Sequence, residues 1–192
     1  MTRRARTCSR LIGLVALAAA STGCLVLGLN RFADDASVTF DARLVGVWRD
    51  ADDGVTVTIE KSDWQSYRLS YVHPIATGQL TGYLFKLGGS TFVDLMPVRG
   101  QDPGVFTIAA HALVRVEIDD DTLTVAPLSF DWFARMLDAH KAPADLSLVR
   151  TERDQLVATT SSEQLRAWLR ERPASDQVFG PAATFTKERP PS

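Results

Sequence analysis

Short runs of alternating apolar and polar residues dominate the chain from Leu44 onward. Residues 55–59 and 67–71 alternate strictly, which predicts strands that bury one face and expose the other. Reading the whole chain in this way predicts nine or ten short strands. Their ranges are 44–48, 55–59, 67–71, 79–87, 91–96, 112–118, 123–125, 146–150, 155–159 and 183–189.

Turn-forming residues separate most of these strands. The predicted turns lie at 50–54, 88–90, 119–121 and 152–154. The first contains Asp-Gly, a typical hairpin signal because such turns need positive φ. Consecutive hairpins favour an antiparallel meander, and closure into a barrel removes its exposed edges. No helical pattern separates the early strands, which argues against a parallel α/β sheet. We therefore expect a mainly β fold that closes into a barrel.

Two later segments have the period of a helix. Within 129–140, apolar residues recur at i, i+3, i+4 and i+7, and Ser129 is placed to cap the first turn. Within 161–171 a shorter apolar stripe follows, and Ser161 with Gln164 fits a capping box. We expect both segments to be α-helices late in a β-rich chain.

The first thirty residues have a different composition. Residues 1–10 hold four arginines and no acid, residues 11–20 are an unbroken apolar run, and small residues precede Cys24. This layout is typical of a secretory signal. The chain length of 192 residues fits one domain besides this segment. The expected division is 1–24 for export, 25–43 as a polar tether and 44–189 as a single β-rich domain.

Three fates are open for the export segment. The residues before Cys24 resemble the lipobox of bacterial lipoproteins, with Thr22 and Gly23 in the small-residue positions, which implies a lipid anchor such as palmitate on Cys24. Alternatively, the alanines at 18–20 offer a cleavage site that releases the protein, or nothing is cut and 11–29 spans the membrane. Because no cysteine follows Cys24, lipidation explains this residue better than a disulfide does. We expect a membrane-anchored protein of the bacterial cell envelope.

The first strand of the predicted barrel carries a short motif. Residues 46–48 read Gly-Val-Trp, which resembles the G-x-W that begins lipocalin-type (calycin) barrels. In that family the tryptophan closes one end of the barrel, and a basic residue of the last strand packs across it. The resemblance gives these parts to Trp48 and to Lys187 or Arg189. A helix just before the last strand, such as 161–171, is also similar to the family.

The linear motifs of several activities are missing. The chain contains no P-loop, no G-x-G-x-x-G, no nucleophile elbow and no H-E-x-x-H, and the acidic run 50–54 lacks the spacing of a calcium loop. After Cys24, 17 basic residues stand against 23 acidic ones, a net charge of −6. A net acidic domain without a basic cluster is a poor nucleic-acid binder. We expect no nucleic acid, no metal, no cofactor and no catalytic residue.

Five residues are the candidates for a ligand site. Asp94 lies in an otherwise apolar strand, where burial of its carboxylate costs several kcal/mol unless the group is paired or protonated. It therefore either forms a salt bridge with an arginine or lines a pocket. The others are aromatic residues of the predicted strands, which either pack in the core or contact a ligand: Trp48, Tyr67, Tyr71 and Tyr83.

Three functions remain open. The first, which we favour, is a non-enzymatic envelope protein that binds a small apolar or amphipathic ligand in or at the mouth of its barrel. The second is a structural or partner-recruiting lipoprotein with a packed core and an apolar patch on the helix 129–140, where Trp132 and Met136 lie off the main stripe. The third is an enzyme whose site is assembled from distant residues such as Asp94 and His111. The size and polarity of the pocket separate them.

We predict that protein extracted from membranes has the intact mass of a chain that begins at Cys24 and carries acyl groups. Cleavage before this residue and lipidation of its sulfur are what the lipobox-like sequence implies. The measurement is intact mass spectrometry of the purified membrane form. A mass equal to that of the full translated chain would contradict lipidation.

Overall fold

A computed structural model describes residues 25–50, 52–98, 108–143, 145–171 and 177–189. The export segment and Cys24 lie outside the described residues. The strands are β1 (Val26–Gly28), β2 (Val38–Thr39), β3 (Gly46–Asp50), β4 (Thr56–Lys61), β5 (Ser66–His73), β6 (Ala76–Leu87), β7 (Ser90–Pro97), β8 (His111–Asp119), β9 (Thr122–Pro127), β10 (Leu148–Arg150), β11 (Leu156–Ala158) and β12 (Ala183–Lys187). The helices are the 3₁₀ turn η2 (Ala42–Leu44), α2 (Phe130–Asp138) and α3 (Ser162–Glu171).

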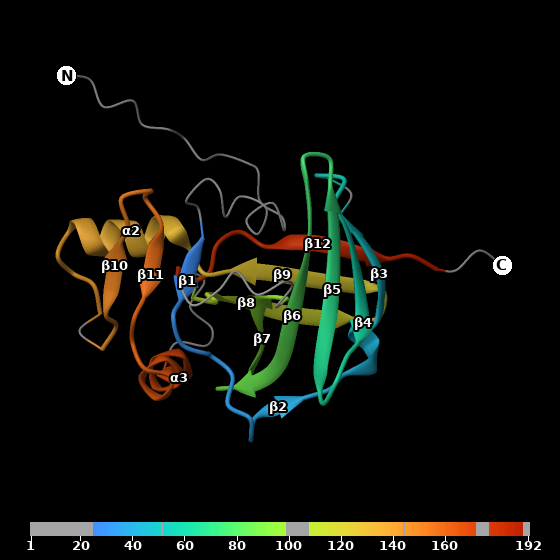
Figure 1. The fold of residues 1–192 in the computed structure, drawn as a ribbon, viewed down its shortest axis with the longest axis horizontal. Helices are drawn as coiled ribbons and strands as arrows, with labels where there is room; N and C mark the ends of the chain where they lie inside the picture. Colours follow the sequence, from blue (N-terminus) through green and yellow to red (C-terminus); the bar gives the residue numbers. More distant parts are fainter. Residues whose placement is uncertain (1–24, 51, 99–107, 144, 172–176, 190–192) are drawn as a thin grey trace.

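Eight of these strands close into an antiparallel barrel (Figure 1). They pair in the order β8-β7-β6-β5-β4-β3-β12-β9, and β9 pairs back to β8. The late strand β12 inserts between β3 and β9 and so completes the ring. The predicted mainly β fold, with a barrel and two late helices, is confirmed.

Local sequence explains most of the strand ends. All ten predicted strands are present, with boundaries shifted by a few residues. Each of the four predicted turns contains a residue with positive φ, a conformation that glycine and aspartate tolerate best. These residues are Gly54 (+68°), Gly89 (+83°), Asp120 (+46°) and Asp154 (+60°).

The stretch 25–43, predicted as a tether, is instead packed into the fold. β1 pairs in parallel with β11 and antiparallel with the start of β8, while β2 pairs with β6. Its buried apolar side chains are Leu25, Val26, Phe32, Ala33 and Val38. The prediction was wrong because these residues have no regular period, so their burial depends on partner strands that lie far away in the sequence.

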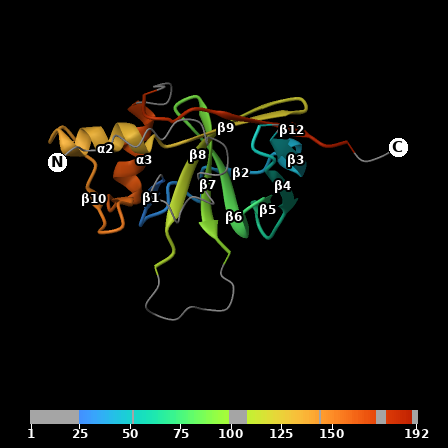
Figure 2. The same ribbon diagram turned by 90° about the horizontal axis from the view of Figure 1, so that it is seen from above.

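Two cores lie on the two faces of the sheet. Inward-facing side chains fill the barrel, and a second cluster lies between the outer wall of the barrel and a layer formed by β1, β10, β11, α2 and α3. Figures 1 and 2 both place this layer on one side of the barrel. On the outer wall Phe85 and Phe92 stack with 5.5 Å between ring centroids, while their neighbours Leu84 and Val93 point into the barrel.

Both predicted helices belong to the outer layer. The Ser129 hydroxyl accepts a hydrogen bond from the Trp132 N–H at 3.3 Å, and the Ser161 hydroxyl accepts one from the Gln164 N–H at 3.4 Å. These contacts confirm the predicted N-caps. The apolar stripes then face the second core, where Phe133 lies 5.7 Å from the Trp168 ring centre.

One end of the barrel is closed by η2 and the G-x-W tryptophan. Trp48 is fully buried, and its indole N–H donates to the Leu44 carbonyl at 2.8 Å. The Lys187 ammonium lies 5.1 Å from the Trp48 ring centre and donates to the Arg43 carbonyl at 2.8 Å. Lys187 therefore occupies the place that the lipocalin resemblance gives to a basic residue. Arg189 instead pairs with Asp121 at 2.7 Å.

The motif glycine leaves room for this lysine. Gly46 has a φ of +149°, and a Cβ built on it would lie 2.5 Å from the Lys187 Cε. Any larger residue would both strain the backbone and push Lys187 away from Trp48. The glycine of the G-x-W motif therefore leaves space for Lys187, and the tryptophan provides the ring on which Lys187 packs.

We predict that Gly46→Ala lowers the free energy of unfolding by about 1–3 kcal/mol, through backbone strain and loss of the Lys187–Trp48 contact. Urea denaturation measures this change. Gly180→Ala is the control, because its new Cβ would meet no atom closer than 3.6 Å. We expect the control to change stability by less than about 0.5 kcal/mol. Equal effects of the two substitutions would contradict the steric explanation.

Candidate ligand site

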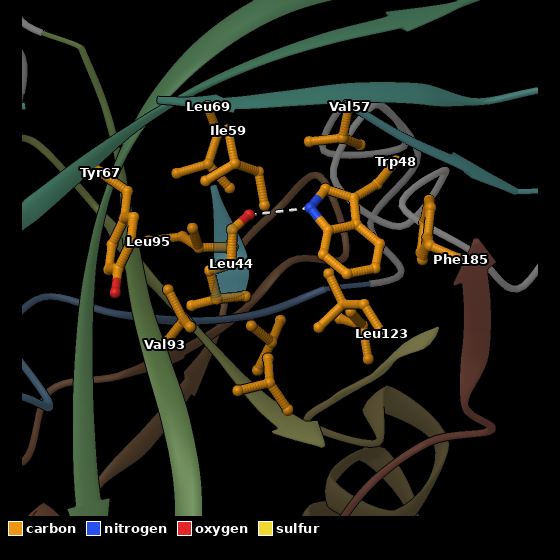
Figure 3. A pocket seen from close by; sticks show the side chains of 13 residues that line it. Leu44, Trp48, Val57, Ile59, Tyr67, Leu69, Val93, Leu95, Leu123 and Phe185 are labelled. Carbon is orange, nitrogen blue, oxygen red and sulfur yellow. Dashed lines mark hydrogen bonds between the residues drawn. The ribbon is translucent and has the colours of Figure 1, made fainter. Parts of the chain in front are cut away.

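The barrel encloses a small apolar cavity of about 40 Å³. Among the residues that the structure describes, its wall consists of apolar and aromatic side chains that point toward one another from the strands and from η2 (Figure 3). They are Leu44, Trp48, Val57, Ile59, Tyr67, Leu69, Val93, Leu95, Val114, Val116, Leu123, Val125 and Phe185. Pockets that hold small molecules usually measure about 300–1,000 Å³. The barrel interior is thus mostly filled by its own side chains.

Tyr67 holds the N-terminal segment, residues 25–43, against the closed end of the barrel. Its hydroxyl accepts from the Asp41 N–H at 2.6 Å and donates to the Asp41 carbonyl at 3.1 Å. Its ring stacks on Phe40 with 5.1 Å between centroids. Burial raises the pKa of the Tyr67 hydroxyl, so the group stays protonated and able to donate. The segment 39–44 is thereby fixed across the barrel end.

A larger polar groove opens beside that end. The pairing of β7 with β8 stops at Phe92 and Arg115, although β6–β7 and β8–β9 continue beyond it. The two strands therefore separate, and a groove of about 570 Å³ lies between them and the N-terminal segment. It is lined by Thr39, Phe40, Asp41, Ala42, Arg43, Leu84, Lys86, Gly89, Ser90, Thr91, Arg115, Val116, Glu117 and Ile118.

The groove contains charged side chains of both signs. Arg43 makes a bidentate contact with Asp41, with its shortest N–O distance at 2.6 Å. The hydrogen bond from Arg43 lowers the pKa of the Asp41 carboxyl despite partial burial, and the nearby charge of Lys86 lowers it further. Arg115 lies 4.9 Å from the Phe179 ring centre, and Glu117 is exposed. The lining thus holds three cations and two anions.

The polar groove and the apolar cavity meet at one residue. Val116 lines both, and it is buried within β8. Leu84 forms a second buried apolar contact of the groove. Because Val116 and Leu84 are only 4% and 1% exposed, the apolar side chains that a molecule in the groove can contact are mainly the half-buried Phe40 and Ile118, and charged side chains lie beside them. This arrangement suits an amphipathic ligand.

The predicted ligand residues are divided between the two faces of the barrel. Trp48 and Tyr67 line the cavity. Tyr71 packs against the barrel core, and its hydroxyl lies 2.5 Å from a Cβ position built on Gly78. Tyr83 lies on the outer wall, where the Arg31 guanidinium is 5.0 Å from its ring centre. The groove residues were not predicted from the sequence. Lys86 could have indicated them, because it is a charged residue at a position of β6 where the preceding residues on the same face are apolar or glycine and point into the barrel.

Asp94 also lies on the outer wall and is fully buried. One carboxylate oxygen is 2.9 Å from His111 Nδ1, and the other accepts from the backbone N–H groups of Phe32 and Ala33 at 2.8 and 3.1 Å. The expected arginine partner is therefore replaced by a histidine and two backbone donors. The carboxylate holds the N-terminal segment against β7.

The positions of these residues give little support to the two alternative functions, an enzyme and a partner-recruiting protein. The structure brings Asp94 and His111 together, but both carboxylate oxygens are occupied and the His111 side chain is only 8% exposed. Trp132 is partly buried and packs against Phe133 at 4.8 Å, and neither Trp132 nor Met136 is a large exposed apolar residue. Within the described ranges, no group of three potential ligand residues could hold a metal ion.

No family model, curated protein or solved structure matches this chain. In the part of the chain that the structure describes, no helix has the length and apolar character needed to cross a bilayer.

We predict that Asp94→Ala lowers the free energy of unfolding by about 3–5 kcal/mol, because it leaves His111 and two backbone donors unpaired in the interior. The measurement is urea denaturation, together with limited proteolysis in the segment 29–35. Asp35→Ala is the control, since its ion pair with Arg31 is on the surface. There we expect less than about 1 kcal/mol. A small effect at Asp94 would contradict its role in fixing the segment.

Proposed function

We propose that this protein is an exported, membrane-anchored protein of the bacterial envelope that binds a small amphipathic ligand without catalysis. The observation that carries this proposal is the mixed lining of the groove, in which charged side chains lie beside the half-buried apolar residues Phe40 and Ile118. The groove of about 570 Å³ is within the size range of small-molecule sites. The cavity of about 40 Å³ is not, so the ligand is placed in the groove and not deep inside the barrel.

The position of the residues after Cys24 argues against an uncleaved span. Leu25 is 5% exposed and belongs to the barrel core, and Val26–Gly28 forms a strand between β8 and β11. These residues cannot also extend a membrane helix over 11–29 while β1 is paired. They fit lipidation of Cys24 as well as release after 18–20, and the intact mass separates these two. A lipid on Cys24 would hold the domain directly at the bilayer surface, without a tether.

Probe binding tests the ligand site. We expect the uncharged fluorescent probe N-phenyl-1-naphthylamine to bind the wild-type protein saturably, at one site per chain. Thr91→Trp fills the groove from a half-buried position of β7, where an aromatic residue suits a strand. We expect it to weaken probe binding at least about tenfold, because the indole occupies the space and the apolar contacts that the probe needs.

Thr58→Trp is the matched control. Thr58 is also half-buried on a barrel strand, but it does not line the groove. The control should bind the probe as the wild type does, with an unchanged circular dichroism spectrum. Absent or non-saturable binding to the wild type, or equal loss in both variants, would overturn the proposal.

A further inference from the structure

The side chain of Lys86 is placed unusually for a barrel lysine. Successive residues of β6 point alternately into the barrel and toward the outer core. Lys86 is two positions after the inward-facing Leu84, so it lies on the same side of the strand. It stands opposite Thr91 on β7, at the level where β7 and β8 have separated. Its charge acts on the Asp41 carboxylate across the groove. The ammonium group therefore belongs to the groove.

The other two cations of the groove are already engaged. Arg43 is held by two-point contact with Asp41, and Arg115 lies over the Phe179 ring and has a further interaction. Among the described residues, Lys86 forms no hydrogen bond and no ion pair. Its three ammonium donors are available to a bound group.

The charges around this lysine decide what binds there. Arg43 is paired with Asp41, and Arg115 lies over the Phe179 ring, so Lys86 and the exposed Glu117 are the remaining charges among the described residues of the lining. The Lys86 ammonium is therefore the positive group of the groove that is open to a bound anion. The half-buried Thr39 and Thr91 line the same groove, and threonine hydroxyls can donate hydrogen bonds to anionic oxygens.

The apolar floor limits which anions fit. Phe40 and Ile118 are half-buried apolar residues of the lining, whereas Leu84 and Val116 are only 1% and 4% exposed. A small inorganic anion would leave Phe40 and Ile118 in contact with water, whereas an alkyl chain would cover them. From these contacts we propose that the groove binds a single-chain amphiphile whose head is a carboxylate or a phosphate, with the head at Lys86 and the chain on Phe40 and Ile118. This inference rests on the proposed function and specifies its ligand.

Competition against N-phenyl-1-naphthylamine tests the head-group preference. We expect decanoate and decyl phosphate to displace the probe at concentrations about tenfold lower than decanol or decyltrimethylammonium, because a charge-assisted hydrogen bond forms only with the anions. Inorganic phosphate alone should not displace it. The preference should shrink as salt is raised, since the site is open to solvent.

Variants of Lys86 separate the two proposals. Lys86→Met should abolish the preference for anions, while the uncharged probe and decanol bind as before. Lys86→Arg should keep the preference for anions. Lys86→Glu should reverse it, so that decyltrimethylammonium binds better than decanoate. Lys141→Met, at an exposed lysine outside the groove, is the matched control and should retain the preference.

Two results would overturn the anion site. One is equal competition by charged and uncharged amphiphiles in the wild type, and the other is an anion preference that persists in Lys86→Met. Either result leaves probe binding, and with it the proposed function, intact. Loss of probe binding by the wild type would instead remove the proposed function itself.

Discussion

The fold depends on how one edge of β8 is divided between two partners. Its first residues, His111 and Ala112, pair with β1, and the remainder from Val114 onward pairs with β9. The second pairing closes the barrel, while the first continues the same sheet outward into β1, β11 and β10. β8 therefore belongs both to the ring and to the sheet of the outer layer. Its first residue, His111, lies beside Asp94, and the Asp94 carboxylate holds the N-terminal segment.

That segment connects the stability of the barrel to its proposed binding surface. After Asp94 fixes it on the outer wall, it pairs with β6 and crosses the barrel end, where Tyr67 and Trp48 hold it by hydrogen bonds. The same crossing residues contribute Asp41 and Arg43 to the polar groove. The groove is thus formed by elements that are fixed through buried contacts, an arrangement that pre-organises a site before its ligand arrives.

Sequence reasoning succeeded where the decisive contacts are local. The strands follow from alternation, the turns from residues that tolerate positive φ, and the helix starts from serine caps. It failed where a contact joins distant parts of the chain. Asp94 required a partner, but its donors come from His111 and from a stretch that was predicted as a tether. Tyr83 was a candidate for the same ligand site as Tyr67, yet it lies on the opposite face, because the β5–β6 register pairs Tyr83 with Ser66 and Tyr67 with Gly82.

The mainly β class, the order of strands and turns, and the two helices follow from the sequence alone, because each depends on residues a few positions apart. It also contained the G-x-W motif, whose glycine and tryptophan have a clear role once Lys187 is seen to lie between them. Three features became visible only in the folded protein: residues 25–43 belong to the domain, the barrel interior is nearly filled, and a polar groove opens where β7 and β8 separate. These features depend on strand register and on side-chain volume within a closed ring, and both are set by pairings between residues far apart in the chain.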